Sequence, residues 1–178
     1  FDNDGWLDLF VANGDAHHEY GEEAVMTHND HKGHFLDVAK RSGPYFEKKQ
    51  VGRAATWGDF DNDGDIDILS IHLNESPHLL RNDTGNKLGH WLTIVPKLAN
   101  GKTDAIGARV TVTTGKLQQI QDLIPMQGYL SQGDPRPHFG LGTAQTADLV
   151  TIRWPDGTTT ALRDVPANQF LKVVQPSR

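Results

Sequence analysis

Asp59-Phe60-Asp61-Asn62-Asp63-Gly64-Asp65-Ile66-Asp67 carries five aspartates in nine residues, the densest acidic stretch of the chain. Carboxylates this close repel one another in any compact fold. They either stay protonated, at a cost in free energy, or surround a multivalent cation. The stretch therefore predicts a metal-binding loop.

The order of the residues in this loop is typical of calcium binding. Ca2+ takes roughly six to eight oxygen ligands from carboxylates, backbone carbonyls and water, and a glycine at the sixth position allows the sharp turn with positive φ. An acidic turn without a metal is the alternative, and magnesium fits less well because it prefers octahedral, water-rich sites. The predicted ligands are the side chains of Asp59, Asp61 and Asp63, the carbonyl of Asp65, whose own side chain we expect to face water, and the closing carboxylate of Asp67.

The segment after the loop distinguishes it from an EF-hand. An EF-hand places a bidentate glutamate at position 12 and continues into a helix. Position 12 here is Ser70, and residues 66–71 are short and rich in isoleucine and leucine. That composition favours a β-strand, so the calcium loop is predicted to lie in a β-turn.

A second copy of the pattern opens the chain. Phe1–Asp8 matches Phe60–Asp67 at an offset of 59 residues, and each copy leads into an apolar strand. A further match pairs Thr27–Asp30 with Leu80–Asp83, each after an apolar strand and before a turn. Repeats of this length are typical of propeller blades or a solenoid.

The first copy is incomplete. Its partial ligand set is Asp2, Asp4 and Asp8, and the chain begins at Phe1, where the aspartate of position 1 is missing. We therefore expect weaker metal binding there, and we expect the chain to be a fragment of a larger protein.

Composition indicates a soluble globular protein that works outside the reducing cytosol. The 178 residues carry a formal net charge of −6 and no cysteine, which excludes disulfides and thiolate metal sites. The acidic balance argues against nucleic-acid binding. No apolar run approaches the ~20 residues of a membrane span.

The pattern changes near residue 87. Short alternating segments separated by turns follow, without a helical period, and predict a β-sandwich-like domain. We therefore predict an all-β chain with partial β-propeller blades in residues 1–87 and the sandwich-like domain in residues 88–178. The predicted strands of that domain include residues 91–95, 108–113, 117–121, 149–154, 159–162 and 170–174.

These motifs resemble two known families. The first half is similar to the FG-GAP/VCBS type of calcium-binding propeller repeat, through residues 34–39 and 52–65. The second half resembles the ASPIC/UnbV domain, and the combination is similar to the C-terminal part of the cartilage acidic protein family and its bacterial relatives. The motifs that carry the second resemblance are residues 104–110, 128–132, 138–142, 153–157 and 164–169.

The resemblance implies a secreted or cell-surface protein, periplasmic if bacterial, whose propeller presents binding surfaces stiffened by calcium. It supplies no catalytic reaction. The calcium ligands of the family carry over to the five aspartates of the second loop and partially to Asp2, Asp4 and Asp8.

Three other groups of residues have a functional interpretation and a simpler one. His28, His31 and His34, with His17 and His18, fit a zinc site, but they also fit a solvent-exposed hairpin turn. Ser131, Asp134 and His138 are the residue types of a hydrolytic triad, yet they lie too close in sequence and lack a supporting motif. The four tryptophans fit sugar stacking, but core packing is the preferred interpretation. They are Trp6, Trp57, Trp91 and Trp154.

Two classes of function follow. The first is a calcium-stabilised, non-catalytic extracellular binding or adhesion module with a protein or glycan ligand. The second is an accessory region of an enzyme acting on polysaccharide or a secondary metabolite, with catalysis in an N-terminal part outside this chain. A purely structural role is third.

Overall fold

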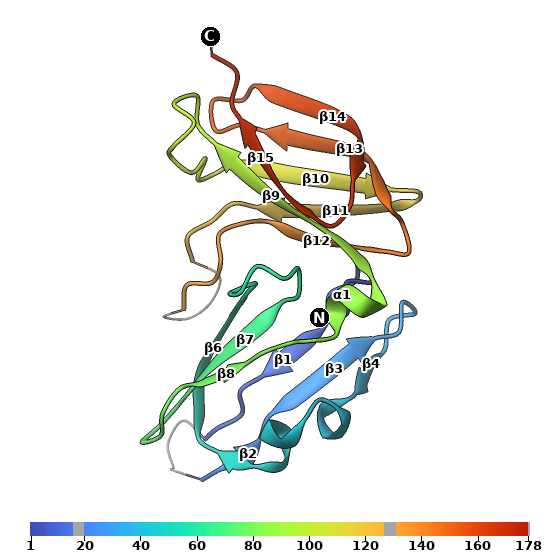
Figure 1. Cartoon of the computed structure of the whole chain (residues 1–178). Helices are drawn as coiled ribbons and strands as arrows, with labels where there is room; N and C mark the ends of the chain where they lie inside the picture. Colours follow the sequence, from blue (N-terminus) through green and yellow to red (C-terminus); the bar gives the residue numbers. More distant parts are fainter. Residues whose placement is uncertain (16–19, 127–130, 178) are drawn as a thin grey trace.

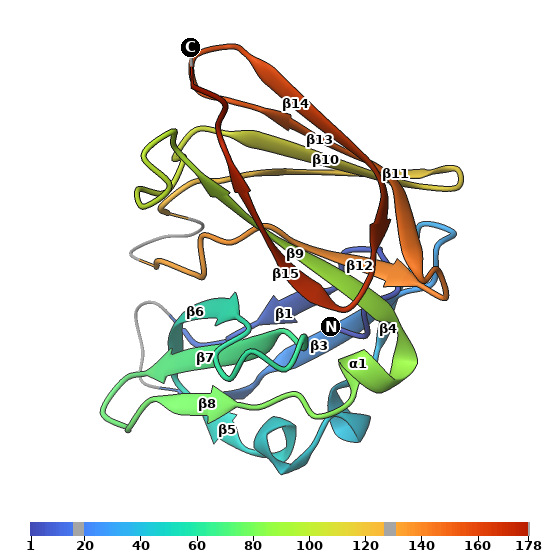
Figure 2. The same cartoon turned by 45° about the horizontal axis from the view of Figure 1, so that its top comes forward.

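The computed structural model describes residues 1–15, 20–126 and 131–177, and it confirms the all-β prediction. Helical structure in these residues is confined to the short α1 (Gly85–Leu88) and two 3-10 turns, η1 (Ala39–Arg41) and η2 (Pro44–Glu47). Figures 1 and 2 show two stacked parts, strands β1–β8 in one and β9–β15 in the other.

The first part contains two three-stranded antiparallel sheets and a short two-stranded ribbon. The strand order is β1-β3-β4 in one sheet and β6-β7-β8 in the other, and β2 pairs with β5. The bounds are β1 (Leu9–Val11), β2 (Glu22–Glu23), β3 (Val25–Asn29), β4 (Phe35–Asp37), β5 (Lys49–Gln50), β6 (Gly52–Gly58), β7 (Asp67–His72) and β8 (His78–Leu80).

The two sheets repeat the same register. Leu9 pairs with Thr27 in the first sheet, and Ile68 pairs with Leu80 at the corresponding place in the second. The offset of 59 residues thus holds for the strands that follow the acidic loops, and the match of residues 27–30 to 80–83 holds for their partners. The predicted repeating unit of loop plus strands is therefore confirmed.

A small hydrophobic cluster lies in the first part. Phe10 packs against Tyr45 and Phe46, with ring centroids 6.3 and 6.0 Å away. The turns η1 and η2 supply much of this cluster, because each sheet is too narrow to bury both faces by itself. Its buried members are Ala24, Met26, Val38, Ala39 and Phe46.

The second part is a sandwich of two sheets. One sheet has the order β11-β10-β13-β14, the other β12-β9-β15, in which β15 runs parallel to β9. The bounds are β9 (His90–Lys97), β10 (Arg109–Thr114), β11 (Leu117–Asp122), β12 (His138–Gly142), β13 (Thr146–Arg153), β14 (Thr159–Pro166) and β15 (Gln169–Val174).

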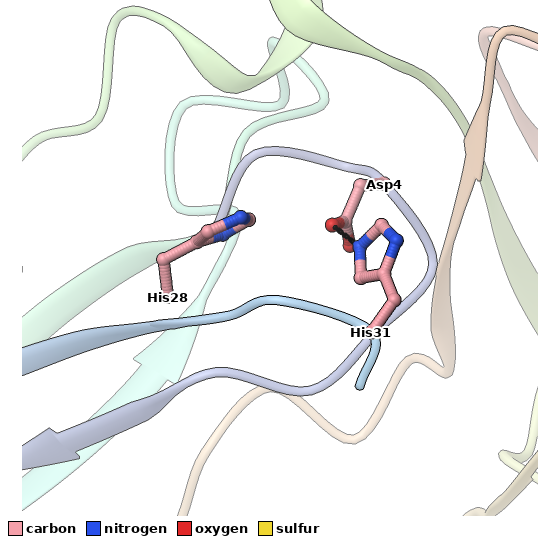
Figure 3. A group of neighbouring side chains, drawn as sticks. All are labelled: Asp4, His28 and His31. Carbon is pink, nitrogen blue, oxygen red and sulfur yellow. Dashed lines mark hydrogen bonds and ion pairs between the residues drawn. The ribbon is translucent and has the colours of Figure 1, made fainter. Parts of the chain in front are cut away.

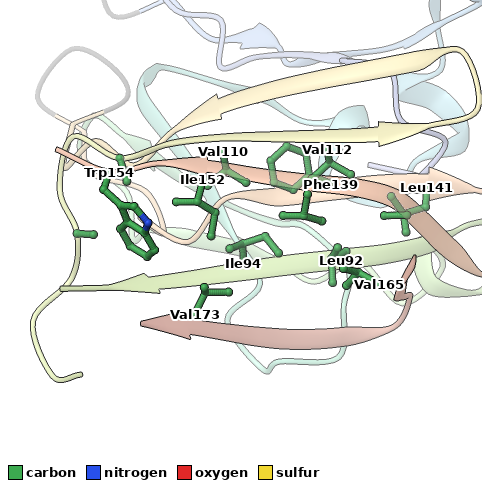
Figure 4. Close-up of a cluster of buried hydrophobic side chains, with 14 residues drawn as sticks. Leu92, Ile94, Val110, Val112, Phe139, Leu141, Ile152, Trp154, Val165 and Val173 are labelled. Atoms are coloured by element: carbon green, nitrogen blue, oxygen red, sulfur yellow. The ribbon is translucent and has the colours of Figure 1, made fainter. Parts of the chain in front are cut away.

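The main core fills the space between these two sheets (Figure 4). Alternation in β10 turns Val110 and Val112 inward, and both are fully buried, as predicted. Phe139 and Trp154 are the largest side chains of this core. Its members are Leu92, Ile94, Ala105, Ala108, Val110, Val112, Phe139, Leu141, Ala147, Val150, Ile152, Trp154, Val165 and Val173.

The tryptophans divide equally between core and surface. Trp91 and Trp154 are buried, whereas Trp6 and Trp57 are 42% and 46% exposed. Core packing was the preferred interpretation of these residues, and it is wrong for Trp6 and Trp57, which belong to neither hydrophobic cluster.

Candidate metal centres

The second acidic loop brings three of its carboxylates together. Oxygens of Asp59, Asp61 and Asp67 lie within 4.8 Å of one another. Asp59 and Asp67 are buried, at 3% and 2% exposed, and Asp61 is exposed. The loop thus forms a cup of oxygens that is closed on one side and open to solvent on the other.

Backbone amides hold two of these carboxylates in place. Asp59 accepts hydrogen bonds from the amides of Asp63, at 3.1 Å, and Gly64, at 2.9 Å. Asp67 accepts from the amides of Phe60, at 3.1 Å, and Asn82, at 2.8 Å. Each oxygen keeps a second lone pair, so these bonds orient the carboxylates without using up their capacity to bind a cation.

Asp63 lies outside this group of three. Its Oδ1 accepts the amide of Asp65 at 2.9 Å, which closes the turn. Gly64 has φ of 93°, as the predicted sharp turn requires, and Asn62 also has positive φ, at 60°.

Burial raises the pKa of two carboxyls of the cup. Desolvation is the main cause for both Asp59 and Asp67, and nearby carboxylates add to it. A cation among them removes both penalties.

The Asp65 side chain does not face water, so that expectation is wrong. Asp65 is fully buried, and its Oδ1 accepts the amide of Asn86 in α1. Its Oδ2 is buried without a hydrogen-bond partner among the described residues. Burial raises the pKa of Asp65 to about 6. The sequence placed this residue at a turn, but the chain returns over it at α1.

The first loop has the same backbone as the second. Asn3 and Gly5 have φ of 59° and 92°, close to the values of Asn62 and Gly64. Asp8 Oδ1 accepts the amide of Asn29 at 2.8 Å, just as Asp67 accepts that of Asn82. The loops are therefore structural equivalents.

Two histidine side chains face the first loop. Asp2 and Asp8 form a group of possible ligands with His28, and Asp4 forms another with His28 and His31. The amino group of Phe1 lies 2.8 Å from Asp8 Oδ2. The structure thus brings Asp2 and Asp8 together, as the loop pattern predicts, and places Asp4 in a second group that shares His28 and adds His31.

Residues of the second part bind both loops, which the sequence did not reveal. His138 Nε2 donates to Asn3 Oδ1 at 2.8 Å, and Arg136 Nη1 donates to Asn62 Oδ1 at 2.7 Å. The two positive-φ asparagines are equivalent, and residues two apart in sequence hold them. The only signal in the sequence is the repeated Asp-Asn-Asp-Gly itself.

Arg136 connects several further groups. Its guanidinium donates to both oxygens of Asp134 and, at 2.8 Å, to the carbonyl of Asp59. It also lies 4.9 Å from the ring centroid of Phe170. Its planar fork therefore fixes the second loop against the sandwich.

A cleft of about 490 Å³ lies where the loops meet the sandwich. Its lining includes the two exposed tryptophans, Trp6 and Trp57, and polar groups from Gln119 and Arg136. Flat apolar faces beside a few fixed polar groups are the usual make-up of a ligand site.

The other groups singled out in the sequence have structural partners. Both ring nitrogens of His138 are engaged, Nδ1 with Thr93 at 2.9 Å and Nε2 with Asn3, so His138 is not oriented as a base for Ser131. His34 pairs with Asp30 at 2.8 Å, apart from His28 and His31. His17, His18 and the motif residues 128–130 lie outside the described residues.

Comparison with known proteins matches both halves. Residues 1–70 match the family model of the FG-GAP-like repeat, and residues 99–178 match that of ASPIC and UnbV. The chain is homologous to cartilage acidic protein 1. It is 28% identical to the Mus musculus protein over 99% of this chain and 29% identical to the Homo sapiens protein over 98% of it.

The chain spans 28% of the length of the mouse relative and 26% of the human one. Among the described residues, no helix has both the length and the hydropathy that crossing a membrane requires.

Proposed function

We propose that this chain, an FG-GAP-like repeat segment followed by an ASPIC and UnbV domain, is a calcium-stabilised, non-catalytic binding module of an extracellular or cell-surface protein. One observation carries the proposal: oxygens of Asp59, Asp61 and Asp67 converge within 4.8 Å in a loop whose backbone already fixes two of them. The separate hydrophobic clusters on either side of α1 support a division into residues 1–87 and 88–178.

Calcium fits this oxygen cup better than other common ions. All side-chain donors are carboxylates, and the loop offers more of them than the water-rich coordination of magnesium uses. In the proposed site Asp59, Asp61 and Asp67 hold the ion, and Asp63 and the carbonyl of Asp65 complete the set by their order in the loop. The first loop binds calcium more weakly through Asp2, Asp4 and Asp8.

The extracellular assignment rests on the relatives and on the ion. The matching relatives carry a name that associates them with cartilage. Calcium sites of extracellular modules commonly have dissociation constants of about 10⁻⁴–10⁻³ M, so they are filled outside cells and largely empty in the cytosol. Calcium then stabilises the fold where the module works.

The cleft beside the loops is the proposed ligand surface. Trp6 and Trp57 line it, and Arg136 joins it to the second loop. Indole rings beside amide and guanidinium groups favour a carbohydrate as the ligand class. Binding to a glycan panel tests this assignment. We expect binding that is lost in Trp57→Ala and kept in an exposed control such as Leu88→Ala. Binding to a protein panel and not to glycans would make the ligand a protein.

Thermal unfolding in EDTA, in millimolar magnesium and in millimolar calcium tests the calcium proposal. The expected result is a rise in Tm with calcium alone that is lost in an Asp61→Ala, Asp63→Ala double variant. Equal Tm values under all three conditions would contradict the calcium proposal. The alternative is that the chain is an accessory region of an enzyme. A pair of catalytic acids or a nucleophile motif elsewhere in the parent protein, together with turnover of a polysaccharide, would favour it.

A further inference from the structure

The first acidic loop differs from the second in the side chains that face it. His31 Nε2 lies 2.5 Å from Asp4 Oδ2, and a ring nitrogen of His28 completes a group of three ligand atoms within 4.8 Å of one another. Figure 3 shows the Asp4 carboxylate between the two imidazole rings. The group contains two nitrogens and one oxygen, unlike the all-oxygen cup of the second loop.

Independent contacts position these three side chains. Asp4 Oδ1 accepts the amide of Trp6 at 2.7 Å, which leaves Oδ2 to face His31. The His31 ring stacks on the Trp6 indole, with centroids 5.0 Å apart and planes 17° apart. His28 lies near the end of β3, and its Nδ1 is buried without a hydrogen bond, 3.1 Å from Asp2 Oδ2.

The second loop provides an internal comparison. The register that pairs Thr27 with Leu80 places Arg81 at the position of His28 and Thr84 at that of His31. Arg81 carries a permanent positive charge and pairs with Asp83 at 2.7 Å. Two loops with one backbone thus carry different chemistry, since only the first has groups that ligate a metal through nitrogen.

We propose that Asp4, His28 and His31 form a zinc site, distinct from the calcium site of the second loop. Imidazole nitrogen suits zinc and neighbouring d-block ions, whereas calcium takes oxygen ligands. Three protein ligands leave a fourth position of the tetrahedron for water or an incoming group. Such a site binds an exchangeable ion beside the cleft, whose lining includes Asp4.

Loading requires changes of about 1.5 Å or less between ligand atoms, since all three lie within 4.8 Å of one another. In a tetrahedron with bonds of about 2.0–2.1 Å, ligand atoms lie ~3.3 Å apart. Asp4 and His31 therefore separate by less than about 1 Å, and zinc replaces the proton that they share in the metal-free protein. Zinc also takes Asp4 from the weak calcium set of the first loop, so the two ions compete there but not at the second loop.

Calorimetric titration with zinc in millimolar calcium tests the proposal, on protein without a histidine tag. We expect one zinc ion per chain, with cobalt(II) giving the visible spectrum of a tetrahedral N/O site. A His28→Arg, His31→Thr double variant carries the residues that the second loop tolerates. In it we expect zinc affinity to fall at least about tenfold, since even loss of an outer partner costs that much.

The matched control is His34→Gln. His34 is exposed, and its ring pairs with Asp30, which is not one of the three proposed zinc ligands. This control should bind zinc as the unchanged protein does, and both variants should keep the calcium-dependent Tm of the second loop. Zinc affinity that is unchanged in the double variant, lost in His34→Gln, or abolished by millimolar calcium overturns the proposal. Loss of the calcium response with zinc binding intact refutes the calcium proposal alone.

Discussion

Gly64 lies so close to the indole of Trp91 that a Cβ added to it would come within 2.0 Å of the ring atoms Cε2 and Nε1. Gly64 belongs to the second acidic loop and Trp91 to β9 of the sandwich. Glycine is therefore required here twice, for its φ of 93° and for the space that the tryptophan occupies. This contact ties the proposed calcium loop to the second part of the molecule.

We expect Gly64→Ala to destabilise the protein by more than about 2 kcal/mol, the sum of left-handed backbone strain and the clash with Trp91. Gly157→Ala is the matched control, since Gly157 has φ of 84° and a Cβ added to it would meet nothing within 4 Å in the described part of the chain. It should lose only about 1 kcal/mol. Chemical denaturation measures the unfolding free energy of both variants. Equal losses of this free energy would show that Trp91 moves aside for the added methyl group without destabilising the protein.

Replacing Arg136 by lysine should lower stability by roughly 1–3 kcal/mol, because a point charge cannot serve Asn62, Asp59 and Asp134 together. It should also weaken calcium binding, since Asn62 lies inside the second loop. Arg109→Lys is the control: the pair of Arg109 with Asp122 is exposed and screened by solvent, so this variant should lose far less stability. Similar losses of stability in the two variants would contradict the role of Arg136 in fixing the second loop against the sandwich.

His138 should make the fold sensitive to acid. Asn3 Nδ2 donates to Gly64 O, which leaves Asn3 Oδ1 facing His138 and places the proton of the neutral ring on Nε2. Burial lowers the pKa of His138 to about 4 from an ordinary value of 6.5. The unfolded chain therefore binds the proton first, and the stabilisation, complete above pH 6.5, is lost as the pH falls toward 4.

The expected loss of unfolding free energy over this range is about 3 kcal/mol. Denaturation in EDTA at several pH values measures it, and His138→Gln should flatten the difference because glutamine keeps a donor for Asn3 without titrating there. Parallel pH curves for the two proteins would assign the acid sensitivity to other groups.

The two acidic loops should respond unequally to calcium. Asp67→Asn keeps an acceptor for only one of the amides of Phe60 and Asn82, which bond to different carboxylate oxygens, and it removes a charge from the cup, so the rise in Tm with calcium should disappear. At free calcium tenfold above the dissociation constant, that rise corresponds to about 1.4 kcal/mol. Asp8→Asn is the matched variant in the first loop and should leave most of the rise; the reverse pattern would mean that the first loop is the stronger calcium site.

Much of the fold was predictable from local pattern. Alternation identified β10, and the Pro155-Asp156-Gly157 turn has the positive φ at Gly157 that its sequence requires. The repeated segments occupy equivalent positions in the two small sheets. These features depend on residues near one another in sequence, where spacing alone restricts the geometry.

The sequence by itself determined the all-β class, the repeat and the acidic loops, because periods of two, positive-φ glycines and clustered carboxylates act over a few residues. Tertiary structure decided which side chains meet. Asp65 is buried because α1 returns over it, and His28 and His31 reach Asp4 because β1 and β3 pair in one register. Arg136 and His138 reach Asn62 and Asn3 across more than seventy residues of chain, and only the packing of the sandwich on the loops brings them together.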